Sequence, residues 1–182
     1  MEGVSHEAAS MAGHMKLGRL IVLFDDNSIS IDGSTNLSTS DDTSGRFEAY
    51  GWQVLSCDGH DMDAVSAAIS AAQTDDRPSL ICCKTIIGLG APNKQGTSGV
   101  HGAPLGDAEI ALARETLGWS HPAFEIPANI LAEWRAVGAQ GAAAHQSWQD
   151  RHAASQNQAT FDAAIANDFD KDVAAAVLTC KN

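Results

Sequence analysis

The sequence predicts an α/β fold, in which helices flank a parallel β-sheet and a helical tail follows on the C-terminal side. Three short apolar runs have the composition of strands that are buried on both faces of a sheet. Each run follows a segment with helical spacing, so helix and strand alternate along the chain. With 182 residues, of which 44% are hydrophobic and 19% charged, the chain is long enough for one packed core.

The first helix–strand unit ends in an unusually polar segment. Small and apolar residues recur at helical spacing over residues 3–17, Gly18 ends this predicted helix, and residues 19–24 form the first predicted strand. The stretch FDDNSISIDG, residues 24–33, follows directly. Ligands of open parallel sheets bind beyond the carboxyl ends of the strands, so we expect this stretch to lie at a binding edge.

Two further units repeat the same order. They are a helix over 43–50 with a strand over 52–57, and a helix over 62–72 with a strand over 79–84. The fold predicted from these units is therefore a three-stranded parallel sheet with crossover helices.

A loop rich in Gly, Pro, Ser and Thr follows the third strand, over residues 85–106. Loops of this length inside a compact domain are usually functional or disordered. A helix is predicted again over 107–117, and residues 124–127 form a short extended link. Because the loop follows the carboxyl end of the third strand, we expect it to be the second segment at the binding edge.

The C-terminal part differs in composition. It is rich in Ala, Gln, Asn and His, with helical spacing over 130–137 and again over 161–178. We therefore divide the chain into a sheet domain, residues 1–126, and a helical linker or tail, residues 127–182.

The charge balance restricts the partners. The formal net charge is −12, from 23 acidic and 11 basic residues spread along the chain. Such a surface repels phosphate backbones and anionic lipids, so neither nucleic acid nor a membrane is expected as a partner. No apolar run approaches the roughly 20 residues that span a bilayer, and the start lacks a basic segment followed by an apolar one. We expect a cytoplasmic protein.

The four cysteines do not form a recognisable motif. Cys82 and Cys83 are neighbours in a predicted strand and should face opposite sides of the sheet, whereas Cys57 and Cys180 stand apart. No spacing resembles a zinc site or a disulfide framework. Buried free thiols are the expected state.

The polar stretch after the first strand contains candidate metal ligands. The carboxamide of Asn27 and nearby backbone carbonyls are hard oxygen ligands that suit Mg²⁺ or Ca²⁺. An ordinary Asx-turn is the alternative interpretation of the same residues. Asp25 and Asp26 are interpreted as supports of this turn.

Five segments of the chain occur in the order and at the spacing of one known family. They are MEGVSHEAASMAGHMKLGRLIVLFDDNSISIDG, RFEAYGWQV, KTIIGLGAPNK, HGAPLGDAEIALARETLGW and FEIP. These segments resemble the bacterial transketolases closely over residues 1–127 and loosely beyond. The resemblance implies that residues 1–126 are the second half of the N-terminal thiamine-diphosphate-binding domain, so that the fold is incomplete.

The resemblance also implies an activity and its cofactors. Transketolases move a two-carbon ketol unit from a ketose phosphate to an aldose phosphate, and they bind thiamine diphosphate through a divalent metal, Mg²⁺ or Ca²⁺. By position, Asn27 matches a metal ligand, and Ile29 matches a residue whose backbone carbonyl is another ligand. Ile31 matches an apolar residue against the cofactor ring. His101 matches a catalytic histidine that reaches the diphosphate and the substrate.

Glu2 and Glu7 match acidic residues at the dimer interface of the family, where the cofactor is shared. The partners implied are sugar phosphates and either a second copy of the chain or a complementing transketolase chain. Without the resemblance, these two glutamates would be interpreted as a solvated helix face. The remaining histidines match no active-site position and are expected to have ordinary roles: His6, His14, His60, His121, His145 and His152.

The chain departs from the family at its start. The metal motif of the family begins with Gly-Asp-Gly ahead of the Asn, and Met1 falls after the place where that tripeptide would stand. We expect either a fragment of a longer reading frame or one part of a split enzyme, inactive by itself. The alternative function is a non-catalytic interaction protein that assembles with a full-length homologue.

Overall fold

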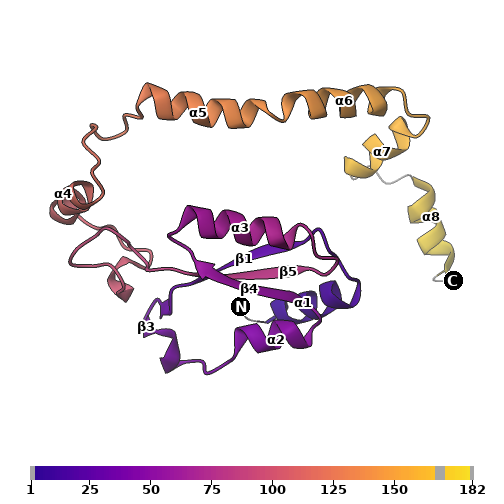
Figure 1. The fold of residues 1–182 in the computed structure, drawn as a ribbon. Coiled ribbons are helices and arrows are strands. Elements are labelled where there is room, and N and C mark those ends of the chain that lie inside the picture. The colour runs from indigo at the N-terminus through magenta and orange to yellow at the C-terminus, as the bar shows by residue number, and fades with distance from the viewer. Residues whose placement is uncertain (1–2, 167–170, 181–182) are drawn as a thin grey trace. The chain divides into compact units, whose positions relative to one another are not determined.

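The computed structural model describes residues 3–166 and 171–180. The chain divides into two compact units, Met1–Ser120 and His121–Asn182. The first contains the sheet, and the second consists of helices (Figure 1). The domain boundary at residue 126 stays a prediction.

The first unit is built on a parallel sheet of three strands in the order β1–β5–β4. These are β1 (Ile21–Asp26), β5 (Ser79–Lys84) and β4 (Gln53–Asp58). The central strand is the most buried, and Leu80 and Ile81 in it are fully inaccessible to solvent. The predicted parallel sheet and the limits of its third strand are confirmed. The expected burial of all three strands is wrong for β1 and β4, which contain no buried residue because they flank the central β5 at the edges of the sheet.

Helices cover both faces of this sheet (Figure 1). Helices α1 (Ser5–His14) and α2 (Thr43–Ala49) lie on one face, and α3 (Met62–Ala72) lies on the other. Cys82 packs with the first two helices and Cys83 with the third, as expected for neighbours in a strand. The predicted limits of α3 are confirmed.

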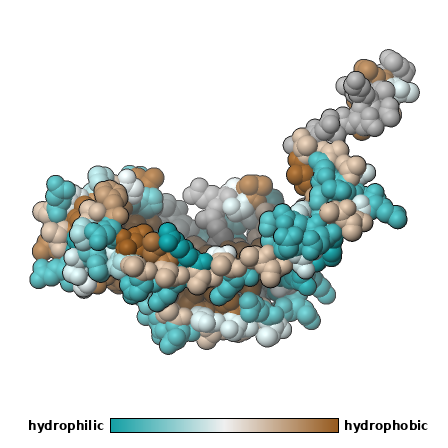
Figure 2. Space-filling view, turned by 90° about the horizontal axis from the view of Figure 1, so that it is seen from above, coloured by the Kyte–Doolittle hydropathy of each residue, from teal (hydrophilic) through white to brown (hydrophobic). Residues whose placement is uncertain are grey.

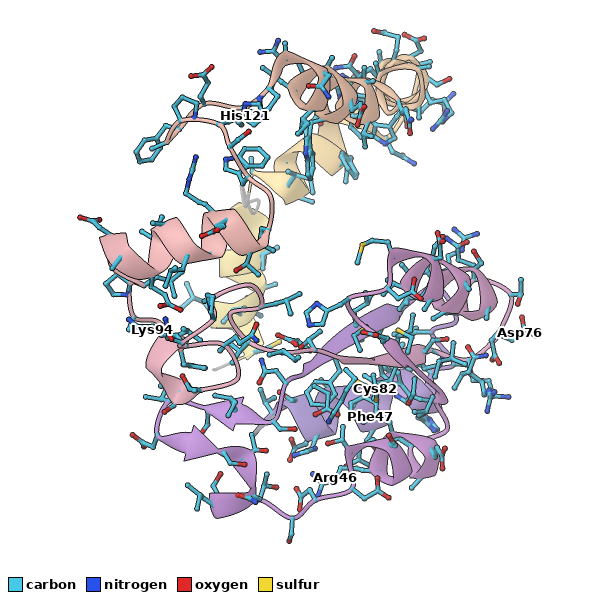
Figure 3. All side chains as sticks on the ribbon, turned by 60° about the vertical axis from the view of Figure 1, so that its left-hand side comes forward. Arg46, Phe47, Asp76, Cys82, Lys94 and His121 are labelled. Atoms are coloured by element: carbon cyan, nitrogen blue, oxygen red, sulfur yellow. The ribbon has the colours of Figure 1, made fainter. Side chains whose placement is uncertain are left out.

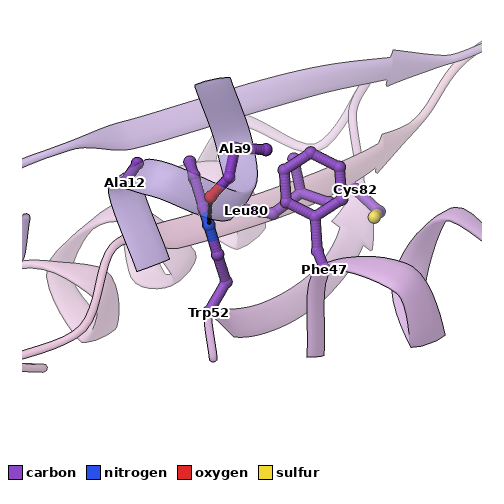
Figure 4. Close-up of a cluster of buried hydrophobic side chains, with 6 residues drawn as sticks. All are labelled: Ala9, Ala12, Phe47, Trp52, Leu80 and Cys82. Carbon is purple, nitrogen blue, oxygen red and sulfur yellow. Dashed lines mark hydrogen bonds between the residues drawn. The ribbon is translucent and has the colours of Figure 1, made fainter. Parts of the chain in front are cut away.

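The core beneath α1 and α2 centres on an aromatic pair (Figure 4). Phe47 meets Trp52 edge to face, with ring centroids 5.0 Å apart. The indole Nε1 of the buried Trp52 donates a hydrogen bond of 2.8 Å to the backbone carbonyl of Ala9. At Gly13 the helix approaches the Tyr50 carbonyl so closely that no Cβ atom fits. This contact explains the small residues that the sequence places along α1.

The end of β1 differs from the prediction. The strand continues through Asp25 and Asp26, which the sequence analysis placed in the polar segment after it. Their backbones pair with Cys83 and Lys84 of β5, and this parallel pairing outweighs the turn preference of aspartate. The polar turn therefore begins at Asn27.

Short elements lie at the binding edge after β1 and again after β5. A hairpin of β2 (Ile29–Ser30) and β3 (Gly33–Ser34) leads into the 3₁₀ helix η1 (Thr35–Leu37). After β5, the long loop contains η2 (Ser98–Val100) and ends at α4 (Asp107–Thr116). The helix predicted after the loop is thus present.

The second unit contains the helices α5 (Ala128–Ala139), α6 (Ala142–Ala153), α7 (Gln158–Ile165) and α8 (Lys171–Cys180). None of α5, α6 and α7 contains a buried residue. Apolar side chains are therefore exposed between hydrophilic ones, and Figure 2 shows such brown areas on one face of the molecule. Among the described residues, no helix has the length and apolar character to cross a membrane.

The predicted tail helices differ from the observed ones. Helix α6 was not predicted, because its segment AAAHQSWQDRHA has no apolar stripe. The helix expected over 161–178 is divided between α7 and α8, and residues 167–170 of that prediction lie outside the described residues.

Candidate functional site

A polar cavity of about 780 Å³ lies at the carboxyl end of β1. It extends to the hairpin, to η1 and to the start of α2, so every wall comes from the edge where a parallel sheet binds ligands. Hydroxyl and carboxylate groups dominate its lining. They belong to four aspartates and to serines and threonines: Asp25, Asp26, Asp41, Asp42, Ser28, Ser30, Thr35, Ser38, Thr39, Thr43, Ser44 and Ser56.

Asn27 is held in a fixed orientation at this cavity. Its Oδ1 accepts a hydrogen bond of 2.9 Å from the backbone N–H of Ile29, and its Nδ2 donates one of 3.2 Å to Asp25 Oδ2. Ser28, between them, has a φ of 62°, in the left-handed region that the tight turn requires. The Asx-turn suggested by the sequence is present. One of the two lone pairs of Oδ1 is used by this turn.

Lys84 joins the ends of β5 and β1. Its Nζ lies 3.0 Å from Asp26 Oδ2 and 3.4 Å from Ser28 Oγ. Next to it, the hydroxyl of Thr85 donates a hydrogen bond to Asp25 Oδ1. Asp25 therefore connects Thr85 with the carboxamide of Asn27, so the two aspartates do support the turn, as the sequence suggested.

The opposite wall depends on Arg46 of α2. Its guanidinium donates to Asp41 Oδ2 at 2.8 Å and contacts His6 Nε2 of α1 at 3.1 Å. Figure 3 shows Arg46 and Phe47 on the same helix, with Phe47 directed toward Cys82 of the sheet. One helix thus contributes both to the core and to the charged rim of the cavity.

The loop that carries His101 is anchored by a buried carboxylate. Glu109 of α4 is 7% exposed, and its two oxygens accept hydrogen bonds of 2.8 and 2.9 Å from the backbone and side chain of Asn93. These bonds hold the pKa of Glu109 below its usual range. Lys94, labelled in Figure 3, donates to the Leu105 carbonyl at 2.8 Å. The loop is therefore held by Glu109 of α4 and by the contact of its own Lys94 with Leu105.

The predicted site residues are only partly brought together. Asn27 and Ile29 line the cavity, whereas Ile31 is 70% exposed and is not among its lining residues. His101 follows η2, is exposed, and does not line this cavity either. Their roles at a cofactor stay predictions.

Glu7 is exposed on α1, and Glu2 lies outside the described residues. The assignment of both to an interface stays a prediction. Within residues 3–166 and 171–180, no group of three or more His, Cys, Asp or Glu side chains is arranged to hold a metal ion.

Sequence reasoning missed two features of the site. His6 was given an ordinary role, yet it lines the cavity and contacts Arg46, which lies forty residues further along the chain. Lys84 was left unassigned. Lys84 ends β5 in register with Asp26 of β1, so pairing the two predicted strands would have placed it at the site.

The sequence matches the family model described as transketolase, thiamine diphosphate binding domain, over residues 1–173. The chain belongs to the transketolase family. This membership confirms the resemblance and the identification of the fold as part of a thiamine-diphosphate-binding α/β domain.

Individual transketolases agree with this result. The transketolase of Cereibacter sphaeroides is 58% identical over 168 residues, which cover 92% of this chain and 26% of the relative. Transketolase 1 of Vibrio parahaemolyticus is 62% identical over 149 residues, covering 81% of this chain and 22% of the relative. The crystal structure of the Campylobacter jejuni transketolase has a TM-score of 0.81 at 35% identity, covering 89% of this chain and 26% of that one. The chain thus spans about a quarter of the length of these transketolases.

Proposed function

We propose that this chain contributes part of a transketolase, which transfers a two-carbon ketol unit from a ketose phosphate to an aldose phosphate with thiamine diphosphate and a divalent metal. The polar cavity at the carboxyl end of β1, in a chain of this family, is the observation that supports the proposal. The rest of the catalytic apparatus belongs to the three quarters of a transketolase that the chain does not span.

The charges around the cavity fit a diphosphate only together with a cation. Four aspartates line the cavity, and Arg46 is the one Lys or Arg residue in the lining. This excess of carboxylates would repel a diphosphate that carries no cation. A divalent ion between the carboxylates and the diphosphate attracts both and so turns repulsion into attraction. The lining therefore favours the magnesium or calcium complex of thiamine diphosphate.

Asn27 and Ile29 are the residues that would hold this metal. The second lone pair of Asn27 Oδ1 and the backbone carbonyl of Ile29 are hard, neutral ligands. Asp25 acts as a positioning residue, because its bond to Nδ2 keeps the oxygen of Asn27 directed away from it. Since Mg²⁺ requires about six oxygens, the diphosphate, water and other parts of the enzyme supply the remainder.

Thiamine diphosphate supplies the nucleophilic carbon and the electron sink for the transferred unit. The chain's own contribution is binding, orientation and proton transfer. His101 is the residue that would donate a hydrogen bond or a proton to a sugar hydroxyl or to the diphosphate. The Glu109–Asn93 contact holds the loop that carries it. Ile31 offers apolar surface to the cofactor ring.

The proposed assembly is a dimer in which Glu7 and Glu2 lie at the interface, or a complex with a complementing transketolase chain. A cytoplasmic location stays a prediction. The identity to complete transketolases, 58–62% over the matched residues, supports an enzyme part over a non-catalytic interaction protein.

A chimeric enzyme tests the proposal. Residues 1–173 replace the matching segment of the Cereibacter sphaeroides transketolase, and ketol transfer and cofactor binding are measured. We expect activity and Mg²⁺-dependent binding of thiamine diphosphate by calorimetry. Asn27→Ala should weaken that binding, whereas Asn36→Ala, an exposed asparagine outside the cavity lining, should not. Equal affinity of the two variants would remove Asn27 from the ligands.

The same chimera tests His101. We expect His101→Ala to lower kcat by roughly 10²-fold or more, the usual effect of losing a positioned proton-transfer group. His145→Ala, an exposed histidine of α6, is the control. Unchanged turnover of the His101 variant would show that the loop histidine is incidental.

The 182 residues alone should show no ketol transfer, even with saturating thiamine diphosphate and Mg²⁺. The preorganised surroundings that make cofactor binding favourable are incomplete in a quarter of the enzyme. Measurable turnover by a homogeneous preparation would contradict this expectation.

A further inference from the structure

Two cysteines that are far apart in the sequence lie side by side on one face of the sheet, in neighbouring strands. Cys57 of β4 and Cys83 of β5 are register partners, so their side chains project from the same face. Their Sγ atoms are 3.9 Å apart, and the Cys57 thiol donates to the Cys83 sulfur. Twenty-six residues separate them, and strand pairing alone brings them together.

The two thiols have unequal access to solvent. Cys57 is half-buried and lines an open cavity of about 600 Å³ at the ends of β4 and β5. Cys83 is 7% exposed, packs under α3, and donates to the Ile81 carbonyl at 3.6 Å. Burial, followed by the contact with Cys57, raises the pKa of Cys83 to about 11. Cys82 also lines this cavity, whereas Cys83 does not, so a small oxidant there reaches Cys57 before Cys83.

The backbone geometry allows a bond between the two sulfurs. Neighbouring strands lie about 4.7–4.9 Å apart, within the roughly 4.4–6.8 Å between Cα atoms that disulfides span. To form the bond, the sulfurs must approach from 3.9 Å to about 2.05 Å.

We propose that Cys57 and Cys83 form a peroxide-sensitive dithiol, in which Cys57 is oxidised first and Cys83 closes a disulfide between β4 and β5.

The chemistry is balanced with a hydroperoxide as the oxidant. The sulfur of Cys57 attacks the peroxide oxygen, the O–O bond breaks, and Cys57 sulfenic acid and an alcohol or water form. The sulfur of Cys83 then attacks the sulfur of Cys57 and displaces its hydroxyl, which leaves as water with the thiol proton of Cys83. In total, two thiols and one hydroperoxide give one disulfide, one alcohol or water, and one further water.

The high pKa of Cys83 makes the second step the slower one, because little thiolate is present to attack. The sulfenic acid of Cys57 should therefore persist long enough for a dimedone trap. The new bond would lie one residue before Asp58 and Lys84, and Lys84 pairs with Asp26 beside the candidate site.

The test uses the 182-residue chain with Cys180→Ser, which removes the exposed thiol that would otherwise link two molecules. The folded protein is treated with hydrogen peroxide, and its peptides are analysed by mass spectrometry without reduction. We expect a linked Cys57–Cys83 peptide and the loss of two of the three remaining thiols. Dimedone added with the peroxide should label Cys57 and suppress the link.

Two further variants separate the proposed pair from its neighbour. Cys82→Ser, in the same strand but on the opposite face, should form the link normally, whereas Cys83→Ser should stop at the dimedone-reactive sulfenic acid of Cys57. Failure of peroxide to modify Cys57 in the folded Cys180→Ser protein would overturn the proposal. So would oxidation of Cys57 without a link to Cys83, or a link to Cys82 instead.

Discussion

The two units of the chain use the same residue types in opposite ways, and their tryptophans show this best. Trp52 in the first unit is 3% exposed and hydrogen-bonded inside a core, whereas Trp134 on α5 is 73% exposed. In the first unit, segments distant in sequence bury each other through the sheet. In the second, helices of 8 to 12 residues with no buried side chain depend on local contacts.

This difference shows where the fold's stability resides. Helices of this length are marginal in water by themselves, because most helical stability in proteins comes from packing of an apolar face. The first unit supplies that packing to α1, α2 and α3, and hence to the candidate site at the sheet edge. The second unit instead leaves large apolar side chains such as Trp134 and Ile165 exposed.

The largest expected effect comes from exchanging the two tryptophans for alanine. Trp52→Ala removes a buried ring and leaves the Ala9 carbonyl without its indole donor, so we expect a loss of about 3–5 kcal/mol in the free energy of unfolding. Trp134→Ala should change it by less than about 0.5 kcal/mol. Urea denaturation followed by circular dichroism measures both. Similar losses would remove the proposed contrast between the units.

The sequence determines the sheet more clearly than the helices of the second unit. The limits of β5 were predicted correctly, because a fully buried strand reads as a continuous apolar run. The end of β1 was not, because aspartate signals a turn, and only the pairing of Asp26 with Lys84 extends the strand. Helix α6 escaped prediction because its segment has no apolar stripe, and its stacking of Trp148 on His145 and His152 is visible only in the structure.

The candidate site was predictable where it depends on a local motif and was missed where it depends on contacts between distant residues. Asn27 follows an apolar run that predicts a strand, and its short motif identifies it without any knowledge of distant contacts. The pairs His6–Arg46 and Asp26–Lys84 join residues forty or more positions apart, so a reading of local patterns misses them. The opposed thiols of Cys57 and Cys83 were missed for the same reason.

A pair of glycines provides the next test. At Gly13, an added Cβ would collide with the Tyr50 carbonyl, and the backbone must shift to relieve it. We expect Gly13→Ala to destabilise the chain by about 1–3 kcal/mol. At Gly138 in α5 a Cβ meets nothing within 4 Å, so Gly138→Ala should favour the helix by about 0.5–1 kcal/mol. Thermal unfolding with circular dichroism should show shifts of opposite sign, and a neutral Gly13→Ala would contradict the close approach.

A smaller effect is expected at the contact between α6 and α7. His152 Nε2 lies 2.8 Å from Asp162 Oδ1, and Trp148 stacks on the same imidazole. The contact is partly exposed, so Asp162→Asn should cost about 0.2–1 kcal/mol, and less at high salt under conditions where the imidazole is charged. Helix content at 222 nm in low and high salt measures this. Asp150→Asn, which alters a contact within α6, is the control. Equal losses in both variants would show that the His152–Asp162 pair is not specific.

The smallest effect concerns the ion pair of Asp75 and Arg77 in the turn between α3 and β5. It is partly exposed, like the His152–Asp162 contact of the second unit. Asp75 accepts hydrogen bonds from the Arg77 backbone N–H, Nε and Nη2 at 2.8, 3.0 and 2.8 Å. These bonds lower the pKa of Asp75 from 3.8 to about 2.

Because the folded-state pKa of Asp75 is the lower one, its carboxylate stabilises the fold at pH values above the unfolded-state pKa. This contribution disappears as the pH falls from about 4 to about 2. The difference in stability between the wild type and Asp75→Asn should therefore be constant above about pH 5 and shrink toward pH 2. Asp76→Asn, the adjacent carboxylate, is the control, and an NMR titration of the Asp75 carboxyl carbon gives its midpoint directly. A midpoint near 3.8 would show that the Arg77 fork does not persist in solution, so that exposed ion pairs contribute equally little in both units.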